Sequence, residues 1–332
     1  MSLPEMSRIP KLSIVVATYR RPDHLSHLLN ALLAQTAPLE DFEIIVVDND
    51  EKPDPQVQAL CASTRFQNLK YIHHAQLGIS NARNRGAQEA HAALVAFPDD
   101  DTLPLPDWVT QVFKIRADTK ADILGGTHKP FYTSTPPRWF KDKYAIPNLG
   151  NHAHWLDGKK ALPGGNSIWN RDLFFRLGGF SENFGYVGNK KISGEDNELC
   201  QRAHLAGIGI WYDPSLTILH HCKPERMSVP WQLTAIMRHS QMKAHLILRE
   251  TRLTDKRPVF RQLLTIFKKF LLYIIRFFSA CFMTPFRNRK EYPYVENYMM
   301  EKIGPELRQI SLMFEMMRCL LFYSDKTQTG LV

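Results

Sequence analysis

The sequence contains few cysteines, and their placement excludes two classes of small protein. Five cysteines are spread over 332 residues, and no two of them form a CxxC pair. Such scattering rules out a disulfide scaffold and a zinc ribbon, which both need closely spaced cysteines. Unpaired cysteines fit a reducing compartment, so we expect a cytoplasmic protein.

Long apolar runs are also missing. No stretch of about 18 uncharged apolar residues is present, so the sequence predicts no clean transmembrane span. Residues 1–11 contain Glu5, Arg8 and two prolines but no apolar core, and we therefore expect no signal peptide. With 44% hydrophobic and 23% charged residues, the chain can bury a full core and is not disordered. Its length suggests one large domain or two.

Acidic residues are absent from residues 256–290, a segment that contains nine basic ones. The whole chain has 42 Lys and Arg against 33 Asp and Glu, so the remaining 33 basic residues balance the acidic ones. Outside this segment the chain is therefore formally neutral. We expect no nucleic-acid partner, because such a protein needs a basic working surface.

Strand and helix signals alternate in the first half of the chain. A helix is predicted from Pro22, because the leucines after it recur at helical spacing. A loop feeding a second helix is predicted over 78–90. β-branched runs typical of buried strands lie at 12–17, 42–47, 69–73 and 93–97. This alternation indicates an α/β fold with a doubly wound sheet.

The second half begins with an irregular stretch. Residues 131–165 are rich in Pro, Trp, Asn, His and Gly and have no clear period, which favours a binding loop. Order returns at 170–177, followed by a predicted helix at 197–206 and a predicted strand at 216–222. From Trp231 onward the pattern is helical.

The strongest chemical signal is the run Asp99-Asp100-Asp101, directly after the fourth predicted strand. Open α/β sheets bind ligands at the carboxyl ends of their strands. Three adjacent carboxylates repel one another unless a cation lies among them, and hard oxygen ligands suit Mg²⁺ or Mn²⁺. The alternatives are a solvated acidic turn and a phosphatase of the haloacid-dehalogenase type. Leu103 and the motif's place on the fourth strand disfavour the phosphatase.

A second signal is the segment 193–199, in which Asp196 is predicted to lie at a helix N-terminus. The helix dipole favours an ionised carboxylate there, as a general base requires, although a plain N-cap aspartate has the same pattern.

In the segment 78–86, two arginines at a helix start indicate either a diphosphate-binding site or a solvated turn. Asp48, at a strand end, suits a base or ribose hydroxyl.

The doublet His220-His221 precedes Cys222 and raises the question of zinc. Alternate residues of a strand share a face, so only His220 and Cys222 would point together. No second pair with metal-site spacing is present, and zinc is disfavoured. A single histidine that completes a Mg²⁺ or Mn²⁺ shell fits better.

Together these segments resemble the family 2 glycosyltransferases of the GT-A fold, over residues 11–226. Within that family the chain looks most like bacterial exopolysaccharide transferases of the succinoglycan type. The motifs that carry the resemblance are, in order, residues 13–21, Val46 to Asp50, residues 78–86, Phe97 to Asp101, Gly164 to Ser167, Gly194 to Asp196, and the histidine doublet before Pro224. The resemblance implies a mixed sheet flanked by helices, with a helical C-terminal extension.

The resemblance also implies an inverting transfer from a nucleotide-sugar, most often a UDP-sugar, to a glycan or lipid-linked saccharide. Asp196 would be the general base, and Glu195 would position the base or the acceptor. Gly165 and Asn166 would line the acceptor pocket. The residues implied to bind the donor nucleotide are Thr18, Arg20, Asp48, Arg83, Asp99 and Asp100. The residues implied to hold Mg²⁺ or Mn²⁺ are Asp101, Asp99 and either His220 or His221. A catalytically silent sugar-nucleotide-binding protein is the remaining alternative.

We expect two domains, a catalytic domain at 1–230 and a helical region at 231–332. In the helical region, a basic stripe of Arg261, Lys268, Lys269 and Arg276 faces away from many apolar residues. This pattern favours a helix in an anionic membrane surface, which would place the protein at the inner face of the cell membrane. A helix packed on the catalytic domain or in a dimer is the alternative; the sequence leaves the oligomeric state open.

Overall fold

The computed structural model describes residues 9–146, 149–158, 160–182, 185–187, 190–192, 194–254 and 259–322. Ser193, Lys256 and Arg257, which belong to the motifs above, lie outside these residues. The chain divides into two compact units. Unit 1 consists of Met1–Phe131 with Ile146–His221, and unit 2 consists of Tyr132–Ala145 with Cys222–Val332.

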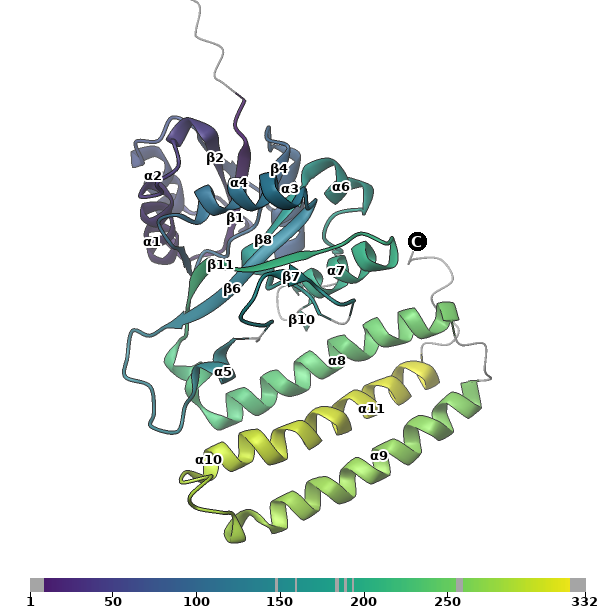
Figure 1. Cartoon of the computed structure of the whole chain (residues 1–332). Helices are drawn as coiled ribbons and strands as arrows, with labels where there is room; N and C mark the ends of the chain where they lie inside the picture. The colour runs from purple at the N-terminus through teal and green to yellow at the C-terminus, as the bar shows by residue number, and fades with distance from the viewer. Residues whose placement is uncertain are drawn as a thin grey trace, which may run out of the picture. The chain divides into compact units, whose positions relative to one another are not determined.

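Unit 1 is built on a mixed sheet with strand order β3-β2-β1-β4-β8-β6-β11-β5, with β7 paired to β11 (Figure 1). The strands β1 to β4 are parallel to their neighbours in this group, whereas β8 runs antiparallel to both β4 and β6. Their bounds are β1 Leu12–Thr18, β2 Phe42–Asp48, β3 Leu69–His73, β4 Leu94–Ala96, β5 Thr102–Pro104, β6 Ile123–Phe131, β7 His154–Trp155, β8 Ser167–Asn170 and β11 Trp211–His221. A separate hairpin pairs β9 Gly185–Val187 with β10 Lys190–Ile192.

Helices cover both faces of this sheet, and the alternation of side chains along the strands gives each face its own core. In β1, Ile14 and Val16 belong to one core, while Val15 belongs to the other. The first core is completed by α1 Pro22–Leu33, α2 Pro55–Ser63 and α4 Trp108–Thr119. The second is completed by α3 Ile79–Gln88, α6 Arg171–Arg176 and α7 Glu195–Leu205. The predicted α/β class with a doubly wound mixed sheet is confirmed.

Two predicted elements differ in length from the observed ones. The strand predicted at 216–222 begins earlier, at Trp211, because its first residues pair with β6 and with β7. The helix predicted at 197–206 begins at Glu195, directly after Gly194, which has a φ of +120°. Glu195 and Asp196 therefore lie in the first turn of α7, where free N–H groups favour carboxylates.

Unit 2 consists mainly of three long helices that run side by side, with α11 between α8 and α9 (Figure 1). The helices are α8 Val229–Thr254, α9 Val259–Phe282 and α11 Gly304–Phe322, joined by the short α10 Val295–Tyr298 and the π-helical segment Met299–Ile303. Their shared core contains Leu248, Ile266 and Met316. Among the described residues, no helix combines the length and apolar character needed to cross a membrane.

Part of the irregular stretch belongs to unit 2 and contains the short helix α5 Asp142–Ala145. Lys141 and Lys143 both pair with Glu301, at 2.9 and 2.8 Å, and the Trp139 carbonyl accepts a hydrogen bond from Asn297. These contacts bridge residues about 160 positions apart, which local periodicity does not reveal. The two compact units therefore do not follow the expected boundary at 230/231. The assignment of 1–230 as the catalytic domain and 231–332 as a helical region stays a prediction.

Helix α9 carries two apolar stripes with different environments. Leu263, Ile266, Phe270 and Tyr273 belong to the core shared with α8 and α11. The second stripe is exposed and consists of Leu264, Phe267, Leu271, Ile275, Phe278 and Phe282. At 100° per residue it lies between the packed stripe and the basic one. Packing within unit 2 thus accounts for only part of the apolar surface of α9.

Gly126 of β6 provides a test of the sheet. A Cβ at this position would lie 1.8 Å from the carbonyl oxygen of Leu216 in β11, which is far inside contact distance. We expect Gly126→Ala to push these two strands apart and to lower the free energy of unfolding by about 1–3 kcal/mol, measured by urea denaturation. Gly304→Ala is the control: its Cβ meets a flexible Ile236 methyl at 3.2 Å and the Met299 carbonyl oxygen at an ordinary contact distance of 3.6 Å, so stability should hold or rise. Equal stability of both variants would contradict the expectation.

Candidate active site

The carboxyl ends of three neighbouring parallel strands bring the predicted donor-binding residues together. β1 ends at Thr18, β2 ends at Asp48, and the chain after β4 forms the turn Asp99–Asp101. The hydroxyl of Thr18 donates to Asp100 Oδ2 at 2.9 Å. Because β1 and β4 pair in parallel, Thr18 and Asp100, which are 82 positions apart in the sequence, lie in direct contact.

Asp48 is fully buried and only partly satisfied. Its Oδ2 accepts hydrogen bonds from the Tyr71 hydroxyl at 2.9 Å and from the Asp54 backbone N–H at 2.7 Å. Its Oδ1 is buried and has no hydrogen-bond partner among the described residues. A buried acceptor without a donor costs free energy, so this oxygen is suited to receive an N–H or O–H from a ligand.

The three aspartates of the acidic turn have different partners. A backbone hydrogen bond from Thr102 N to Asp99 O, 3.1 Å long, closes the turn. Asp100 accepts from Arg21 at 3.1 Å, yet burial raises the pKa of Asp100 to about 6. Asp101 lies 3.4 Å from His220 Nε2, because Thr102 of β5 pairs with His220 of β11.

Asp99, Asp101 and His220 form a group whose ligand atoms all lie within 4.8 Å of one another. Two carboxylates and one imidazole are a donor set that Mn²⁺ or Mg²⁺ accepts. The residues predicted to hold the divalent ion are thus brought together, and the donor chemistry fits. In the doublet it is His220 that joins the aspartates. His221 instead packs against His24 and Phe131, at 5.3 and 5.1 Å between ring centroids, so it is removed from the predicted metal ligands.

His128 of β6 belongs to this site and was not predicted. Its ring stacks on that of His220, with centroids 5.2 Å apart and planes inclined by 12°. Burial, with His220 as a second cause, lowers the pKa of His128 to about 4, so this imidazole stays neutral at physiological pH. No motif in the sequence marks His128, because the ring that it stacks on belongs to another strand, β11.

Arg83 connects the acidic turn to α7. The guanidinium donates to Asp99 Oδ1 at 2.6 Å and to Glu195 Oε1 at 2.8 Å, and the residue is only 3% exposed. Burial works to lower the pKa of Arg83, but the carboxylates outweigh it and raise the pKa above its ordinary value. The Glu195 pKa is raised by burial and by neighbouring Asp196. Arg83 thus holds together two carboxylates that are 96 residues apart in the chain.

The turn Gly164-Gly165 lies against the side chains of Asp196 and Asp99. The Gly164 N–H donates to Asp196 Oδ2 at 2.9 Å, and a Cβ on Gly164 would approach that oxygen to 3.0 Å. A Cβ on Gly165 would lie 2.5 Å from Asp99 Oδ2. Only glycine permits this approach of backbone to carboxylates. Asp99 and Asp196 therefore flank one short turn.

Two predicted site residues have other partners. Asn166 is fully buried; its amide accepts from Trp108 Nε1 at 3.0 Å and donates to the carbonyls of Thr127 and Leu216. Its side chain cannot line an acceptor pocket, and we correct that expectation: Asn166 fixes the glycine turn to the sheet. Arg20 has a side chain 62% exposed and makes a bidentate pair with Asp50, at 2.5 and 3.0 Å.

Comparison with known proteins gives consistent matches. The model for "Glycosyl transferase family 2" matches residues 13–178. Glycosyltransferase AglE of Haloferax volcanii is 27% identical over 225 residues, which are 66% of this chain and 69% of that protein. Glucosyl-dolichyl phosphate glucuronosyltransferase of the same organism is 29% identical, over 67% of this chain and 72% of that protein.

Succinoglycan biosynthesis protein ExoM of Rhizobium meliloti is also similar, with 29% identity over 71% of this chain and 75% of its own. Among solved structures, TarS of S. aureus in complex with UDP-GlcNAc superposes with a TM-score of 0.53 at 18% identity, covering 92% of this chain and 91% of that one. This likeness shows the GT-A type of fold. The family match covers half of the sequence and includes the donor-side strands and the acidic turn, and the chain therefore belongs to glycosyl transferase family 2.

Proposed function

We propose that the protein is an inverting glycosyltransferase that moves a sugar from a nucleotide-sugar to an acceptor hydroxyl. The observation that carries the proposal is the Gly164-Gly165 turn, which has Asp99 on one side and Asp196 on the other. A donor-side carboxylate and a candidate base thus lie against adjacent residues of one turn. This arrangement suits a donor diphosphate and an acceptor hydroxyl that react across one anomeric carbon.

The donor nucleotide would lie at the carboxyl ends of β1, β2 and β4. Asp48 Oδ1, buried and without a partner among the described residues, would accept a hydrogen bond from the nucleobase. Thr18 and Asp100 would lie beside the ribose, and Arg20 would reach the nucleotide only after leaving Asp50. The related TarS structures contain UDP and UDP-GlcNAc, which supports a uridine nucleotide here.

Asp99, Asp101 and His220 would hold a divalent cation, Mg²⁺ or Mn²⁺. Such an ion supplies charge neutralisation for a leaving diphosphate, so that no strong general acid is needed. Neutral His128, stacked on His220, keeps that imidazole in place without adding positive charge. Arg83 holds Asp99 in place through a hydrogen bond to Oδ1.

Asp196 would accept the proton of the acceptor hydroxyl. Its two oxygens are oriented by the Gly164 N–H and by Asn197, whose backbone N–H donates at 2.8 Å. The deprotonating hydroxyl oxygen forms its bond to the anomeric carbon as the bond to the diphosphate oxygen breaks on the opposite face, which inverts the configuration. Glu195 is held by Arg83, so it positions the first turn of α7 rather than taking the proton itself.

We further propose a lipid-linked saccharide as the acceptor, with α9 lying in an anionic membrane surface. The name of one relative, glucosyl-dolichyl phosphate glucuronosyltransferase, refers to a lipid-linked sugar. The exposed apolar stripe of α9 is unusual for a soluble surface, and Phe278 and Phe282 are 64% and 73% exposed. Exposed Lys268 lies beside it, exposed Lys269 lies farther round the basic stripe, and Arg276 pairs with Glu306. Apolar and basic stripes side by side fit anionic lipid.

Asp196→Asn tests the base. The amide keeps the shape but cannot accept the proton, so we expect turnover to fall by about 10²–10⁴-fold with donor binding intact. Turnover is measured with a panel of nucleotide-sugars, and donor binding by calorimetry. Asp172→Asn, the same change at an exposed position in α6, is the control and should act like the wild type. Undiminished turnover in Asp196→Asn would remove this residue from the mechanism. If the wild type binds a nucleotide-sugar but transfers no sugar, the protein is instead a silent binding protein.

Gly165→Ala tests the cation site. The new methyl group would displace Asp99, and we expect the affinity for Mn²⁺ to fall by about 10–100-fold. In Gly164→Ala the methyl group meets Asp196 instead, so turnover should fall while Mn²⁺ affinity is kept. Titration calorimetry with Mn²⁺, with circular dichroism as the folding check, separates the two. Equal Mn²⁺ affinity in both variants would argue against Asp99 as a ligand.

Phe278→Ser with Phe282→Ser tests the membrane surface. Each ring contributes roughly 1.5–3 kcal/mol when buried in an apolar phase, so the double variant should bind anionic vesicles more than tenfold more weakly. Co-sedimentation with phosphatidylglycerol vesicles measures this. Leu205→Ser, at another exposed apolar position, is the control. Unchanged vesicle binding would contradict the proposal, and loss of a dimer in light scattering would assign the stripe to self-association.

A further inference from the structure

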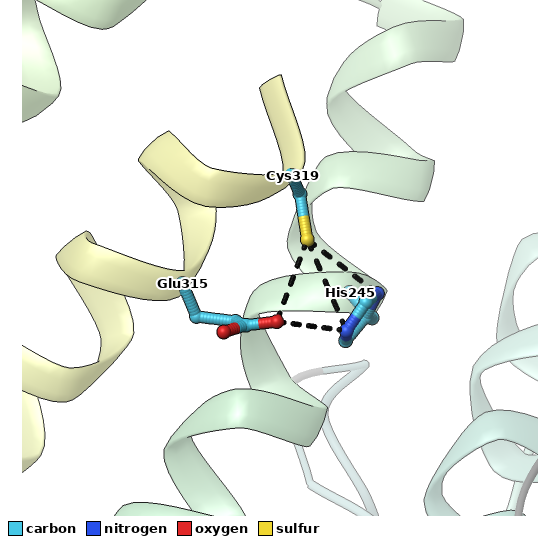
Figure 2. Close-up of side chains that lie close together, drawn as sticks. All are labelled: His245, Glu315 and Cys319. Carbon is cyan, nitrogen blue, oxygen red and sulfur yellow. Dashed lines mark hydrogen bonds and ion pairs between the residues drawn. The ribbon is translucent and has the colours of Figure 1, made fainter. Parts of the chain in front are cut away.

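A second group of metal-binding residue types lies within unit 2, apart from the residues used above. Glu315 and Cys319 are four residues apart on α11, so they share one face of that helix. His245 of α8 points toward both of them (Figure 2). No local motif in the sequence marks this group, because its histidine is 70 residues away from the glutamate.

The distances within the group are short and similar. Cys319 Sγ lies 3.6 Å from Glu315 Oε1 and 3.9 Å from His245 Nε2. His245 Nε2 lies 3.2 Å from Glu315 Oε1. In a tetrahedral zinc site, bonds of about 2.3 Å to sulfur and about 2.0–2.1 Å to nitrogen and oxygen imply ligand-to-ligand separations of about 3.3–3.6 Å. The three atoms already form one face of such a tetrahedron to within a few tenths of an ångström.

Burial separates this group from an ordinary surface cluster. Glu315 is 3% and Cys319 is 4% exposed, and both lie beside the apolar residues Met316 and Leu320. The His245 side chain is 38% exposed, so an ion and a water molecule can reach the group from that side. A carboxylate in such surroundings needs a positive partner. In the structure Arg318 is one, donating to Glu315 Oε1 at 2.6 Å and to Oε2 at 3.0 Å.

We propose that His245, Glu315 and Cys319 bind a zinc ion that links α8 to α11, with water as the fourth ligand. The thiol of Cys319 would release its proton to solvent as the Zn–S bond forms, and Arg318 would keep only Glu315 Oε2. Thiolate and imidazole favour Zn²⁺ over Mg²⁺ and Mn²⁺, so this site differs in chemistry from Asp99, Asp101 and His220. The inference does not rest on the proposed function.

Cobalt(II) in place of zinc provides the test on the full-length protein. We expect one equivalent of Co²⁺ to give the visible bands of a tetrahedral site and a near-ultraviolet sulfur-to-cobalt charge-transfer band, both displaced by Zn²⁺. Cys319→Ser should abolish the charge-transfer band. Cys281→Ser and Cys222→Ser, which change cysteines outside the group, should keep it. Absence of the band in the wild type, its persistence in Cys319→Ser, or its loss in Cys222→Ser would overturn the proposal.

Arg318→Gln sharpens the experiment. The guanidinium competes with the ion for Glu315 Oε1 and repels its charge, so this variant should bind Zn²⁺ about tenfold more tightly than the wild type. Zn²⁺ should also raise the Tm of the wild type by a few degrees, reversibly with chelator, because it binds only the folded helices. An Arg318→Gln protein that binds no Zn²⁺ would show that the group is merely an ion pair. Mn²⁺ affinity at the aspartates should be unchanged in all these variants.

Discussion

The site in unit 1 depends on a buried positive charge between two negative ones. Arg83 emerges from the first turns of α3 and bridges Asp99, after β4, to Glu195, at the start of α7. Removing a guanidinium from water is costly, and two charge-assisted hydrogen bonds at 2.6 and 2.8 Å offset that cost. If either carboxylate were lost, the buried guanidinium would keep only one ion-pair partner, and one of its two short hydrogen bonds would be gone. The bridge thus makes the acidic turn and the start of α7 mutually dependent.

Around this bridge the backbone itself forms part of the site. A Cβ on Gly164 would lie 3.0 Å from Asp196 Oδ2 and one on Gly165 would lie 2.5 Å from Asp99 Oδ2, so a side chain in this turn would displace the carboxylates. Asn166, fully buried, ties the end of that turn to β6 and β11 through two carbonyl groups. The same two strands carry His128 and His220. A rigid connection between turn and strands keeps carboxylates and imidazoles at fixed separations, as preorganised transfer chemistry requires.

In the part of the chain that the structure describes, unit 2 has two features that unit 1 lacks, an exposed apolar stripe and a largely buried group with a thiol. One stripe of α9 packs into the core that this helix shares with α8 and α11. The other stripe is exposed, and no described residue of unit 2 covers it. Inside the unit, sulfur, nitrogen and oxygen ligands meet at His245, Glu315 and Cys319. The aspartate site offers mostly hard oxygen ligands, whereas this group includes a soft thiolate. Ligand chemistry alone would therefore keep two different ions apart in one chain.

Local sequence patterns reveal the strands of the first half of the chain and most of the residue types of the site, but neither β6 nor its His128. Buried strands such as 12–18 and 42–48 are short β-branched runs, and α1 follows from leucine spacing, because local periodicity reflects which face is buried. The acidic turn and Asp196 were recognisable as motifs for the same local reason. Tertiary structure alone decided the partners: His220 rather than His221, Arg83 between Asp99 and Glu195, Asn166 in the scaffold, and His128 against His220. These outcomes depend on strand register and helix packing between distant segments, which no local pattern contains.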